Sequence, residues 1–428
     1  MKTYQSITQF WKCNLFFLFA FISIAANAQG QNSHSENIWT LERILDSIEV
    51  QNAGLQQFAL KTDASNKQAK AVKAWDAPSI GVGLSEFPYN VPKGMAARKM
   101  PMIRLQQMFP NFTRQKNQKA YYESFSRLNK DDRETMKNQL FFQAKNAFTE
   151  AYIAKKKLEV LEQQEKQIQL LLKIAEGRLQ YGKAKLPNIY KIRAKLSDLK
   201  SQRIKIESVV SQSAAILNSL MNRPVRQPLE IDTLTNLAAN RINILSIDSG
   251  YIKSHRSDIQ RISNEIETAR LQQKSILLQG KPTFGLTWDN MRMTGGMYMY
   301  NIMAMVTIPI APWSAKGYKN DAQSIDYEIQ AKQKDFEDKV QQTLGAVRKR
   351  QLEIQTAEKD LNIFKTEVIP AYQKTLQANL DALGENQGNI YETLTAWEDL
   401  TMKEFEYYEK LSDLIKSKIG LQAAIQQY

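Results

Sequence analysis

Hydrophobic and polar residues alternate along the stretch from Lys281 to Ile310. In its first arm every second position is apolar, and after residues 290–296 the alternation resumes; the apolar positions are Phe284, Leu286, Trp288, Tyr298, Tyr300, Ile302, Ala304, Val306 and Ile308. A period of two predicts β-strands with one apolar face. Each arm approaches the ~9–11 residues of a tilted transmembrane strand, and the aromatic residues lie where an interfacial girdle would. Alone, the pattern fits either a membrane-spanning hairpin or a half-buried hairpin of a soluble protein.

The same alternation occurs earlier in the chain, in Ser79–Ser85 and again in Met100–Phe109. A proline precedes and follows each hairpin, and the two leading prolines, Pro78 and Pro282, are 204 residues apart. Two hairpins of one design favour the membrane-spanning interpretation, because a closed β-barrel repeats such strands.

Long helices are predicted between the hairpins. Roughly 65 residues after Pro110 contain neither proline nor glycine, and at ~1.5 Å per residue they would form a helix approaching ~100 Å. Apolar residues then follow alternating steps of three and four, as in a coiled-coil seam, at Ile189, Ile192, Leu196 and Leu199. Turns are predicted at 181–187 and 383–388, and a kink is predicted at Pro370.

The second half of the chain repeats the first. Asn188-Ile189-Tyr190 matches Asn389-Ile390-Tyr391 at a spacing of 201 residues, which indicates a tandem duplication. The predicted segments are 1–28, a signal peptide; 29–77, an N-terminal segment with a leading helix; 78–110, the first transmembrane β-hairpin; 111–222, the first long helix pair; 223–240, a linker; 241–280, the second leading helix; 281–312, the second transmembrane β-hairpin; and 313–428, the second long helix pair.

The N-terminus carries Lys2 and Lys12, an apolar run, and Ala26-Asn27-Ala28, which predicts a secretory signal cleaved after Ala28. The apolar run is shorter than the ~18 residues of a membrane anchor. Cys13, the only cysteine, would leave with this signal. A net charge of +14 could suggest nucleic acid, but the basic residues are interspersed with acidic ones along helices, so we expect no nucleic-acid partner. Two histidines and no nucleophile or phosphate-loop motif argue against an enzyme and against a cofactor.

These features together resemble the outer-membrane efflux (TolC) family over essentially the whole chain after the signal. The matching positions are Leu41, Leu45, Asn52 and Leu55; Tyr181-Gly182 followed by Ile189 and Leu196; and Pro309-Ile310-Ala311-Pro312-Trp313. The chain departs from the family three residues after the turn glycines, where Lys185 and Gln387 replace the frequent serine or threonine.

The resemblance implies a mainly α fold with membrane β-hairpins, in which duplicated long helices form a periplasmic α-barrel. Four strands per protomer leave edges that lipid cannot satisfy, so a homotrimer would close a twelve-stranded outer-membrane β-barrel. Its partners would be a periplasmic adaptor, an inner-membrane efflux pump and outer-membrane lipid. The residues implied at the gate and adaptor turns are Tyr181, Gly182, Asp381, Gly384 and Glu385, of which Asp381 and Glu385 would form acidic rings. A periplasmic adaptor protein is the alternative, which predicts one helical hairpin and polar strands.

Methionines concentrate in the predicted hairpins. Seven of them fall on the face opposite the apolar one, hence toward the lumen: Met100, Met102, Met108, Met297, Met299, Met303 and Met305. Thioether sulfur suits Cu(I) and Ag(I), and weak exchangeable sites suit conduction. Methionine is also a flexible apolar filler. The sequence therefore leaves two cargo hypotheses, a copper or silver channel with transient metal sites and a general drug or multi-substrate exporter.

Overall fold

The computed structural model describes residues 38–85, 100–233, 247–293 and 296–427. The predicted signal peptide and residues 86–99, between the two strands of the first predicted hairpin, lie outside these residues. In chain order the elements are β1 (Ile38–Trp39), α2 (Leu41–Gln51), α3 (Ala53–Ala71), β2 (Ser79–Ser85), β3 (Met100–Phe109), α4 (Phe112–Gln180), α5 (Leu186–Leu220), β4 (Glu230–Ile231), α6 (Ser249–His255), α7 (Ser257–Leu277), the 3₁₀ turn η2 (Leu278–Gly280), β5 (Thr283–Arg292), β6 (Tyr298–Thr307), α8 (Pro312–Ile363), the π-helix η3 (Phe364–Val368), α9 (Ile369–Gly384) and α10 (Ile390–Ile425).

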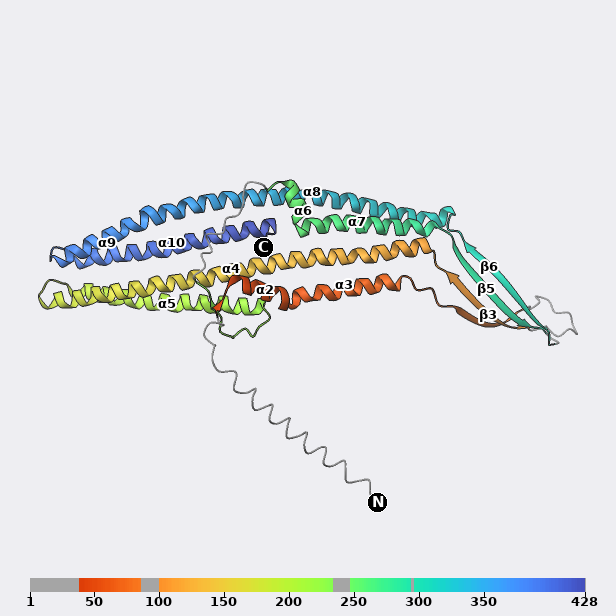
Figure 1. Cartoon of the computed structure of the whole chain (residues 1–428), viewed down its shortest axis with the longest axis horizontal. Helices are drawn as coiled ribbons and strands as arrows, with labels where there is room; N and C mark the ends of the chain where they lie inside the picture. The colour runs from red at the N-terminus through yellow and green to blue at the C-terminus, as the bar shows by residue number, and fades with distance from the viewer. Residues whose placement is uncertain (1–37, 86–99, 234–246, 294–295, 428) are drawn as a thin grey trace, which may run out of the picture.

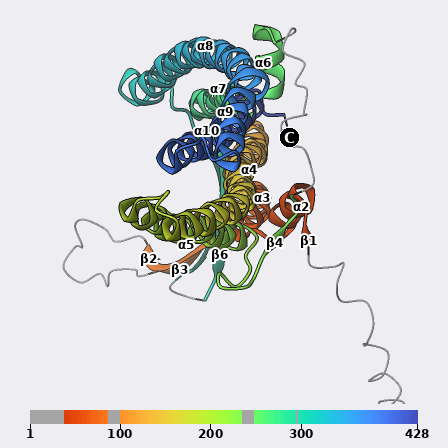
Figure 2. The same cartoon turned by 90° about the vertical axis from the view of Figure 1, so that its left-hand side faces the viewer.

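The described chain is a long bundle of helices with a small sheet at one end (Figure 1). The first repeat comprises α2 to α5 with β2 and β3, and the second comprises α6 to α10 with β5 and β6. An end-on view separates the helices of the two repeats into two groups (Figure 2). α4 has 69 residues, so the predicted uninterrupted helix is confirmed. The turns between α4 and α5 and between α9 and α10 lie at the end farthest from the sheet (Figure 1).

Each leading helix is broken at one residue, where the sequence predicted a single helix. Asn52 (φ −67°, ψ 117°) separates α2 from α3, and Arg256 (φ −86°, ψ 118°), 204 positions later, separates α6 from α7. The Asn52 Nδ2 donates to the Leu220 carbonyl at 2.8 Å, and the Arg256 Nη1 donates to the Ala424 carbonyl at 2.6 Å. Both carbonyls belong to the last turn of a helix, where they lack an intrahelical donor. The break therefore ties the start of each repeat to its end.

The structural repeat has a spacing of 204 residues at the breaks in the leading helices and at the ends of the long helix pairs, whereas β3 and β6 begin 198 residues apart. Gly182 (φ 68°) and Asn386 (φ 64°) both adopt the left-handed conformation that ends a helix. Asn222 (φ 56°) and Gln426 (φ 57°) do the same at the ends of α5 and α10. The sequence matches at a spacing of 201 are therefore three residues out of structural register. Residues three or four positions apart lie on the same face of a helix. A sequence match that is shifted by three residues therefore still falls on the same face.

Two local features were not predicted as they occur. β1 and β4 form a two-stranded parallel ladder, with Ile38 opposite Glu230 and Trp39 opposite Ile231. β4 lies inside the segment predicted as a linker, and β1 lies in the predicted N-terminal segment. The kink predicted at Pro370 is a π-helix, η3, directly before α9. Proline clashes with the carbonyl four residues earlier, here that of Thr366, and the wider π turn accommodates this.

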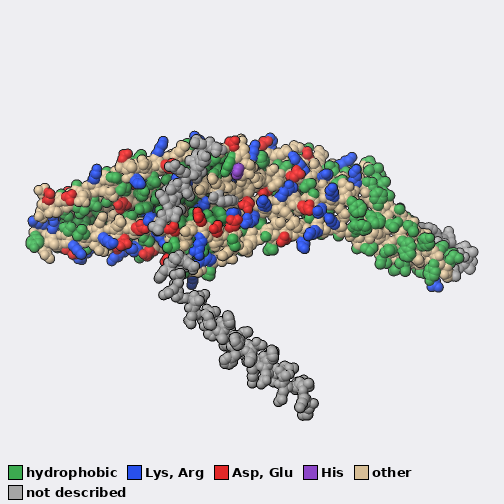
Figure 3. All heavy atoms as spheres, viewed as in Figure 1, with side chains coloured by type: hydrophobic (Ala, Val, Ile, Leu, Met, Phe, Trp, Pro, Cys, Tyr) green, Lys and Arg blue, Asp and Glu red, His purple; other side chains and the backbone are tan. Residues whose placement is uncertain are grey.

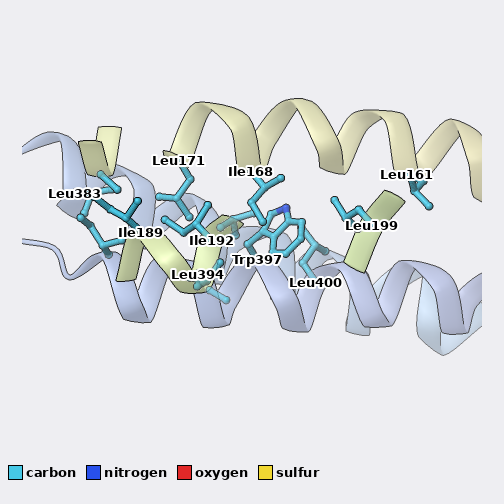
Figure 4. Close-up of a cluster of buried hydrophobic side chains, with 14 residues drawn as sticks. Leu161, Ile168, Leu171, Ile189, Ile192, Leu199, Leu383, Leu394, Trp397 and Leu400 are labelled. Carbon is cyan, nitrogen blue, oxygen red and sulfur yellow. The ribbon is translucent and has the colours of Figure 1, made fainter. Parts of the chain in front are cut away.

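The helix pairs meet in a buried core near the turns. Its side chains come from α4, α5, α9 and α10 and point toward one another (Figure 4); they include Leu161, Ile168, Leu171, Ile189, Ile192, Leu199, Leu383, Leu394, Trp397 and Leu400. The predicted seam residues Ile189, Ile192 and Leu199 are all in it. This core holds the two turns side by side, at the end of the molecule opposite the sheet.

Candidate functional site: the four-stranded sheet and the helix turns

The two hairpins form one antiparallel sheet in the order β2, β3, β5, β6. β3 and β5 pair from Met102 opposite Met291 to Phe109 opposite Phe284. The sheet thus joins the two halves of the chain. β2 and β6 are its edge strands. Among the described strands, β2 pairs only with β3 and β6 only with β5, so the outer side of each is unpaired.

One face of this sheet is apolar and exposed. Its residues include Ile80, Val82, Ile103, Leu105, Phe284, Leu286, Trp288, Tyr298, Tyr300, Ile302 and Val306, all of them exposed, with Val82 at 82%. The space-filling view shows hydrophobic side chains gathered over the strands, whereas charged side chains cover the helices (Figure 3). A patch of this kind marks a surface that meets lipid or another protein. Near the helices Trp75 packs edge-to-face on Phe109 at 5.6 Å, and Trp313 is exposed.

The opposite face, called here the inner face, carries the methionines in rows. The strand register aligns Met102, Met291 and Met299 in one row, and Met108, Gly285 and Met305 in another. A Cβ on Gly285 would lie 2.5 Å from the Met108 sulfur, so glycine leaves room for the methionines on both sides. Met100 pairs with Ser85, and Met303 pairs with Thr287. The structure therefore places six of the seven predicted lumenal methionines on one face.

Two methionine assignments differ from the sequence prediction. Met297 precedes β6 and is exposed outside the sheet. Met291, placed in a loop by the sequence, lies within β5 and is only 7% exposed. The predicted loop 290–296 begins too early, because Asn290, Met291 and Arg292 still pair with Tyr300, Met299 and Tyr298. Asparagine usually signals a turn, and here cross-strand pairing overrides it.

An ion pair lies between the methionine rows. The Arg104 Nε and Nη2 donate to the two carboxylate oxygens of Asp289 at 2.7 and 2.9 Å. This two-pronged geometry is the strong form of such a pair. Asp289 is buried under neighbouring side chains, whereas Arg104 is partly exposed. Neither residue was singled out from the sequence, since only the register brings them together across 185 positions.

Two sulfur atoms accept hydrogen bonds on the inner face. Ser85 Oγ lies 3.3 Å from the Met291 sulfur, and Gln106 Nε2 lies 3.8 Å from the Met108 sulfur. Among the described residues, no cluster of three histidine, cysteine, aspartate or glutamate side chains could hold a metal ion. Within the same part of the chain, no helix has both the length and the apolar character to cross a membrane.

The helix turns contain the predicted gate residues in unequal settings. Tyr181 is the C-cap residue of α4 and is exposed, and Gly182 follows it in the left-handed conformation. The equivalents in the second turn are Glu385 and Asn386. Gly384 is the last residue of α9, so it does not supply the turn conformation that the sequence assigned to it. Asparagine tolerates positive φ, which explains how the turn forms without a glycine there.

The two turns touch through one arginine. Arg178, in the last turn of α4, donates to the carbonyls of Leu383 and Gly388 and to Asn386 Oδ1. Asp381 is exposed and accepts from Gln377 Nε2 at 2.8 Å. Carboxylates at the C-terminus of a helix oppose its dipole, so neither Asp381 nor Glu385 contributes to the stability of α9 by its charge.

No protein-family model and no curated protein matches the chain. Solved structures do match. The chain is similar to CusC, described as forming a transmembrane channel, at 16% identity and a TM-score of 0.75, over 93% of this chain and 95% of that chain. It is similar to the CmeC outer-membrane channel of Campylobacter jejuni at 12% identity and a TM-score of 0.72, over 90% and 85% of the two chains. The open-state MtrE outer-membrane channel of Neisseria gonorrhoeae matches at 14% identity and a TM-score of 0.69, over 93% and 94%.

The chain therefore has the fold of these channel proteins, and the likeness extends over nine-tenths of its length. The resemblance to the TolC family read from the sequence is confirmed at the level of the fold. The predicted mainly α architecture with two β-hairpins is also confirmed. The alternative of a periplasmic adaptor predicted one helical hairpin and polar strands, and the structure has two helical hairpins and an apolar sheet face.

Proposed function

We propose that the protein is the outer-membrane channel of a tripartite efflux system. The observation that carries the proposal is the four-stranded sheet, which has an exposed apolar face and two unpaired edge strands. In lipid every backbone donor and acceptor must be satisfied internally. β2 and β6 would satisfy theirs by pairing with neighbouring copies, and three copies would give the twelve-stranded barrel of a homotrimer. The apolar face would then meet outer-membrane lipid.

The helices would continue the barrel into the periplasm. α4, at ~1.5 Å per residue, extends roughly 100 Å from the sheet to the turns. A periplasmic adaptor would dock at the turns and connect the channel to an inner-membrane efflux pump, which supplies the energy. The protein would conduct passively and carry out no chemical reaction.

Asp381 and Glu385 would form acidic rings at the closed end, and the cation selectivity of an Asp381→Asn, Glu385→Gln variant measures their effect.

Membrane fractionation tests the proposal. We expect the full-length protein in the outer-membrane fraction, migrating as a trimer in detergent before heating and as a monomer afterwards. Epitope tags next to Met293 should be accessible on intact cells, and tags next to Gly182 should be hidden until the outer membrane is permeabilised. A periplasmic monomer, or the reverse accessibility of the two tags, would contradict the proposal.

The inner-face methionines favour copper or silver ions as cargo over a general range of drugs. Met102, Met291 and Met299 lie side by side in one row, and three copies would place nine thioethers around one level of the lumen. Soft sulfur ligands select Cu(I) and Ag(I). Filling of a hydrophobic core does not explain this row, because it lies on the inner face of the sheet, which would line the lumen of the barrel.

Replacing the methionines by leucine tests the cargo. A variant with leucine at positions 100, 102, 108, 291, 299, 303 and 305 should still assemble, because leucine and methionine have similar volumes. We expect a deletion strain that carries it to lose copper or silver tolerance relative to wild type. Met402→Leu, an exposed change on α10, is the control. Metal tolerance that is unchanged while drug export depends on the protein would establish the general exporter instead.

A further inference from the structure

Basic residues gather where the helices meet the sheet. The ends of α3 and α7 and the starts of α4 and α8 border the sheet there (Figure 1). These segments contain ten lysines and arginines and one acidic residue, in 67–78, 111–119, 274–282 and 312–320. The adjoining stretches of the same helices contain six basic and eight acidic residues, in 55–66, 120–131, 261–273 and 321–332. The positive charge of these four helices is therefore concentrated at the boundary, and the ten residues are called here the basic belt.

Both repeats contribute lysines to the basic belt at matching positions. Lys116 and Lys119 are the fifth and eighth residues of α4, and Lys316 and Lys319 are the fifth and eighth residues of α8. Lys119 pairs with Glu123 at 2.9 Å, whereas the other three form no ion pair with a described residue. The belt is therefore a property of both halves of the chain, as a band of charge around a closed barrel requires.

Local stability accounts for only part of the basic belt. A cation in the last turn of a helix is favoured by the helix dipole, which explains Lys70 in α3 and Lys274 in α7. In the first turn a cation opposes the dipole, yet α4 has Arg114 there and no acidic residue to offset it. α8 also lacks an acidic residue in its first turn. Residues that break a local rule without a structural gain point to a function.

Aromatic side chains connect the basic belt to the apolar face of the sheet. Trp75 packs edge-to-face on Phe109, at the end of β3, and on Phe112, at the start of α4, with ring centroids 5.6 and 6.4 Å apart. Trp75 and Phe112 are both exposed. Lys73 is exposed two residues before Trp75, and Lys116 is exposed one helical turn after Phe112, on the same face of α4. The lysines therefore lie beside the aromatic cluster that borders the sheet.

α8 begins with the same combination of residues. Its second residue, Trp313, is exposed, and Lys316 is exposed three residues later on the same face. Tryptophan is enriched at the boundary between hydrocarbon and water, and lysine lays its stem along apolar surface while its ammonium group stays in a polar layer. An apolar surface followed by tryptophan and then by lysine matches the layers of a phospholipid leaflet: acyl chains, interface and phosphate groups.

We propose that the basic belt binds the headgroups of anionic phospholipids in the periplasmic leaflet of the outer membrane. The inference rests on the proposed channel function, which sets the sheet in the membrane and the helices in the periplasm, and it names the lipid that the protein selects. Phosphatidylglycerol and cardiolipin carry net negative charge, whereas the ammonium group of phosphatidylethanolamine offsets its own phosphate. Charge complementarity with the belt therefore favours the anionic lipids.

Spin-labelled lipids measure this preference. The protein is reconstituted in phosphatidylcholine bilayers with a trace of labelled phosphatidylglycerol or phosphatidylethanolamine, and the fraction of label that the protein immobilises gives a relative association constant. We expect phosphatidylglycerol to associate at least about threefold more tightly, because basic residues near a membrane surface attract anionic lipid. The ratio should fall toward one in roughly 1 M sodium chloride, which screens charge. Sodium phosphate of equal ionic strength should act no more strongly; a stronger effect would make free phosphate the ligand and overturn the proposal.

Lysine variants locate the site of the preference. One variant replaces three exposed, unpaired lysines of the basic belt by glutamine: K73Q/K116Q/K316Q. It should lose most of the preference for phosphatidylglycerol, and arginine at the same three positions should keep it. The matched control removes three exposed lysines of the helices far from the sheet and should also keep the preference: K173Q/K200Q/K374Q. An unchanged preference in the belt variant, or an equal loss in the control, would overturn the proposal.

The same spectra separate a failure of this inference from a failure of the channel function. If the protein immobilises both labelled lipids with equal association constants, the basic belt does not select lipid, although the sheet lies in the membrane. If the protein immobilises neither lipid, the sheet does not contact the bilayer, and the proposed channel function is refuted together with the lipid site.

Discussion

Gly384 and Gly388 differ in what surrounds them, although both lie near the second turn. A Cβ on Gly388 would lie 2.5 Å from the Leu383 nitrogen and 2.8 Å from the Ala382 carbonyl carbon, both of them backbone atoms. A Cβ on Gly384 would meet nothing within 4 Å. Close approach of the backbone, and not a left-handed conformation, is therefore the reason for Gly388.

Gly388→Ala should lower the free energy of unfolding by about 1–3 kcal/mol, because backbone has to move to make room. Gly384→Ala, on the same turn, should raise it by roughly 1 kcal/mol, since alanine is the better helix former. Denaturant unfolding of the two variants, followed by helical circular dichroism, measures both effects. If both variants changed the free energy of unfolding by the same amount, close backbone contact would not be the reason for Gly388.

Glu404 is a half-buried carboxyl group in the contact between α4 and α10. Its Oε2 accepts from Gln164 Nε2 at 2.7 Å, and Gln164 Oε1 accepts from Thr401 at 3.0 Å. Burial raises the pKa of Glu404. A raised pKa means that the folded protein favours the protonated form of Glu404. The contribution of this group to the free energy of unfolding is therefore complete at low pH and is lost as the pH rises through the folded-state pKa.

Glu404→Gln should therefore melt at a higher temperature than wild type at pH 8. The difference should shrink as pH falls, and it should vanish below the ordinary glutamate pKa, where both side chains are neutral. The glutamine can still accept from Gln164, so the hydrogen bond is kept. Thermal melts across this pH range provide the measurement. A variant that is less stable than wild type at pH 8 would show that the carboxylate stabilises the fold.

At the scale of elements, the inner face of the sheet carries one ion pair between its two rows of methionines. Arg104 and Asp289 cancel each other's charge in every protomer. Asp289→Asn should leave three uncompensated arginines in a trimer and shift the channel toward anions, and Arg104→Gln should shift it toward cations. The double variant should return to wild-type selectivity. Reversal potentials in a salt gradient measure all three. Single variants with unchanged selectivity would place the pair outside the conduction path.

Elements with a strong local period could be predicted from the sequence. The strands follow from the spacing of two, and most of α4 follows from the roughly 65 residues after Pro110 that contain neither proline nor glycine. The break at Asn52 could not be predicted, because its cause is the carbonyl of Leu220, 168 positions away. The pairing of Arg104 with Asp289, and the place of Met291 in β5, depend on a register between two distant hairpins. The alternation of apolar and polar residues predicted which methionines share the inner face. Their arrangement in rows follows from the strand register, which only the structure gives.

At the scale of the whole molecule, the sheet and the helix pairs are each incomplete in one copy. The sheet has two open edges, and exposed apolar residues such as Tyr190 and Ile204 remain on α5 after α4 is packed. The open edges belong to the sheet at one end of the molecule (Figure 1), and the exposed apolar residues belong to the helix pairs. Lateral association of copies around one axis would remove both deficits at once, and it gives the closed tube that conduction requires.

Single-channel recording tests this account most directly. Purified full-length protein, separated into unheated trimer and heat-dissociated monomer, is added to a planar lipid bilayer. We predict discrete conductance steps from the trimer and none from the monomer. A protein that stays monomeric in detergent, or a trimer that binds the bilayer without producing conductance steps, would contradict the proposal that the chain forms a channel.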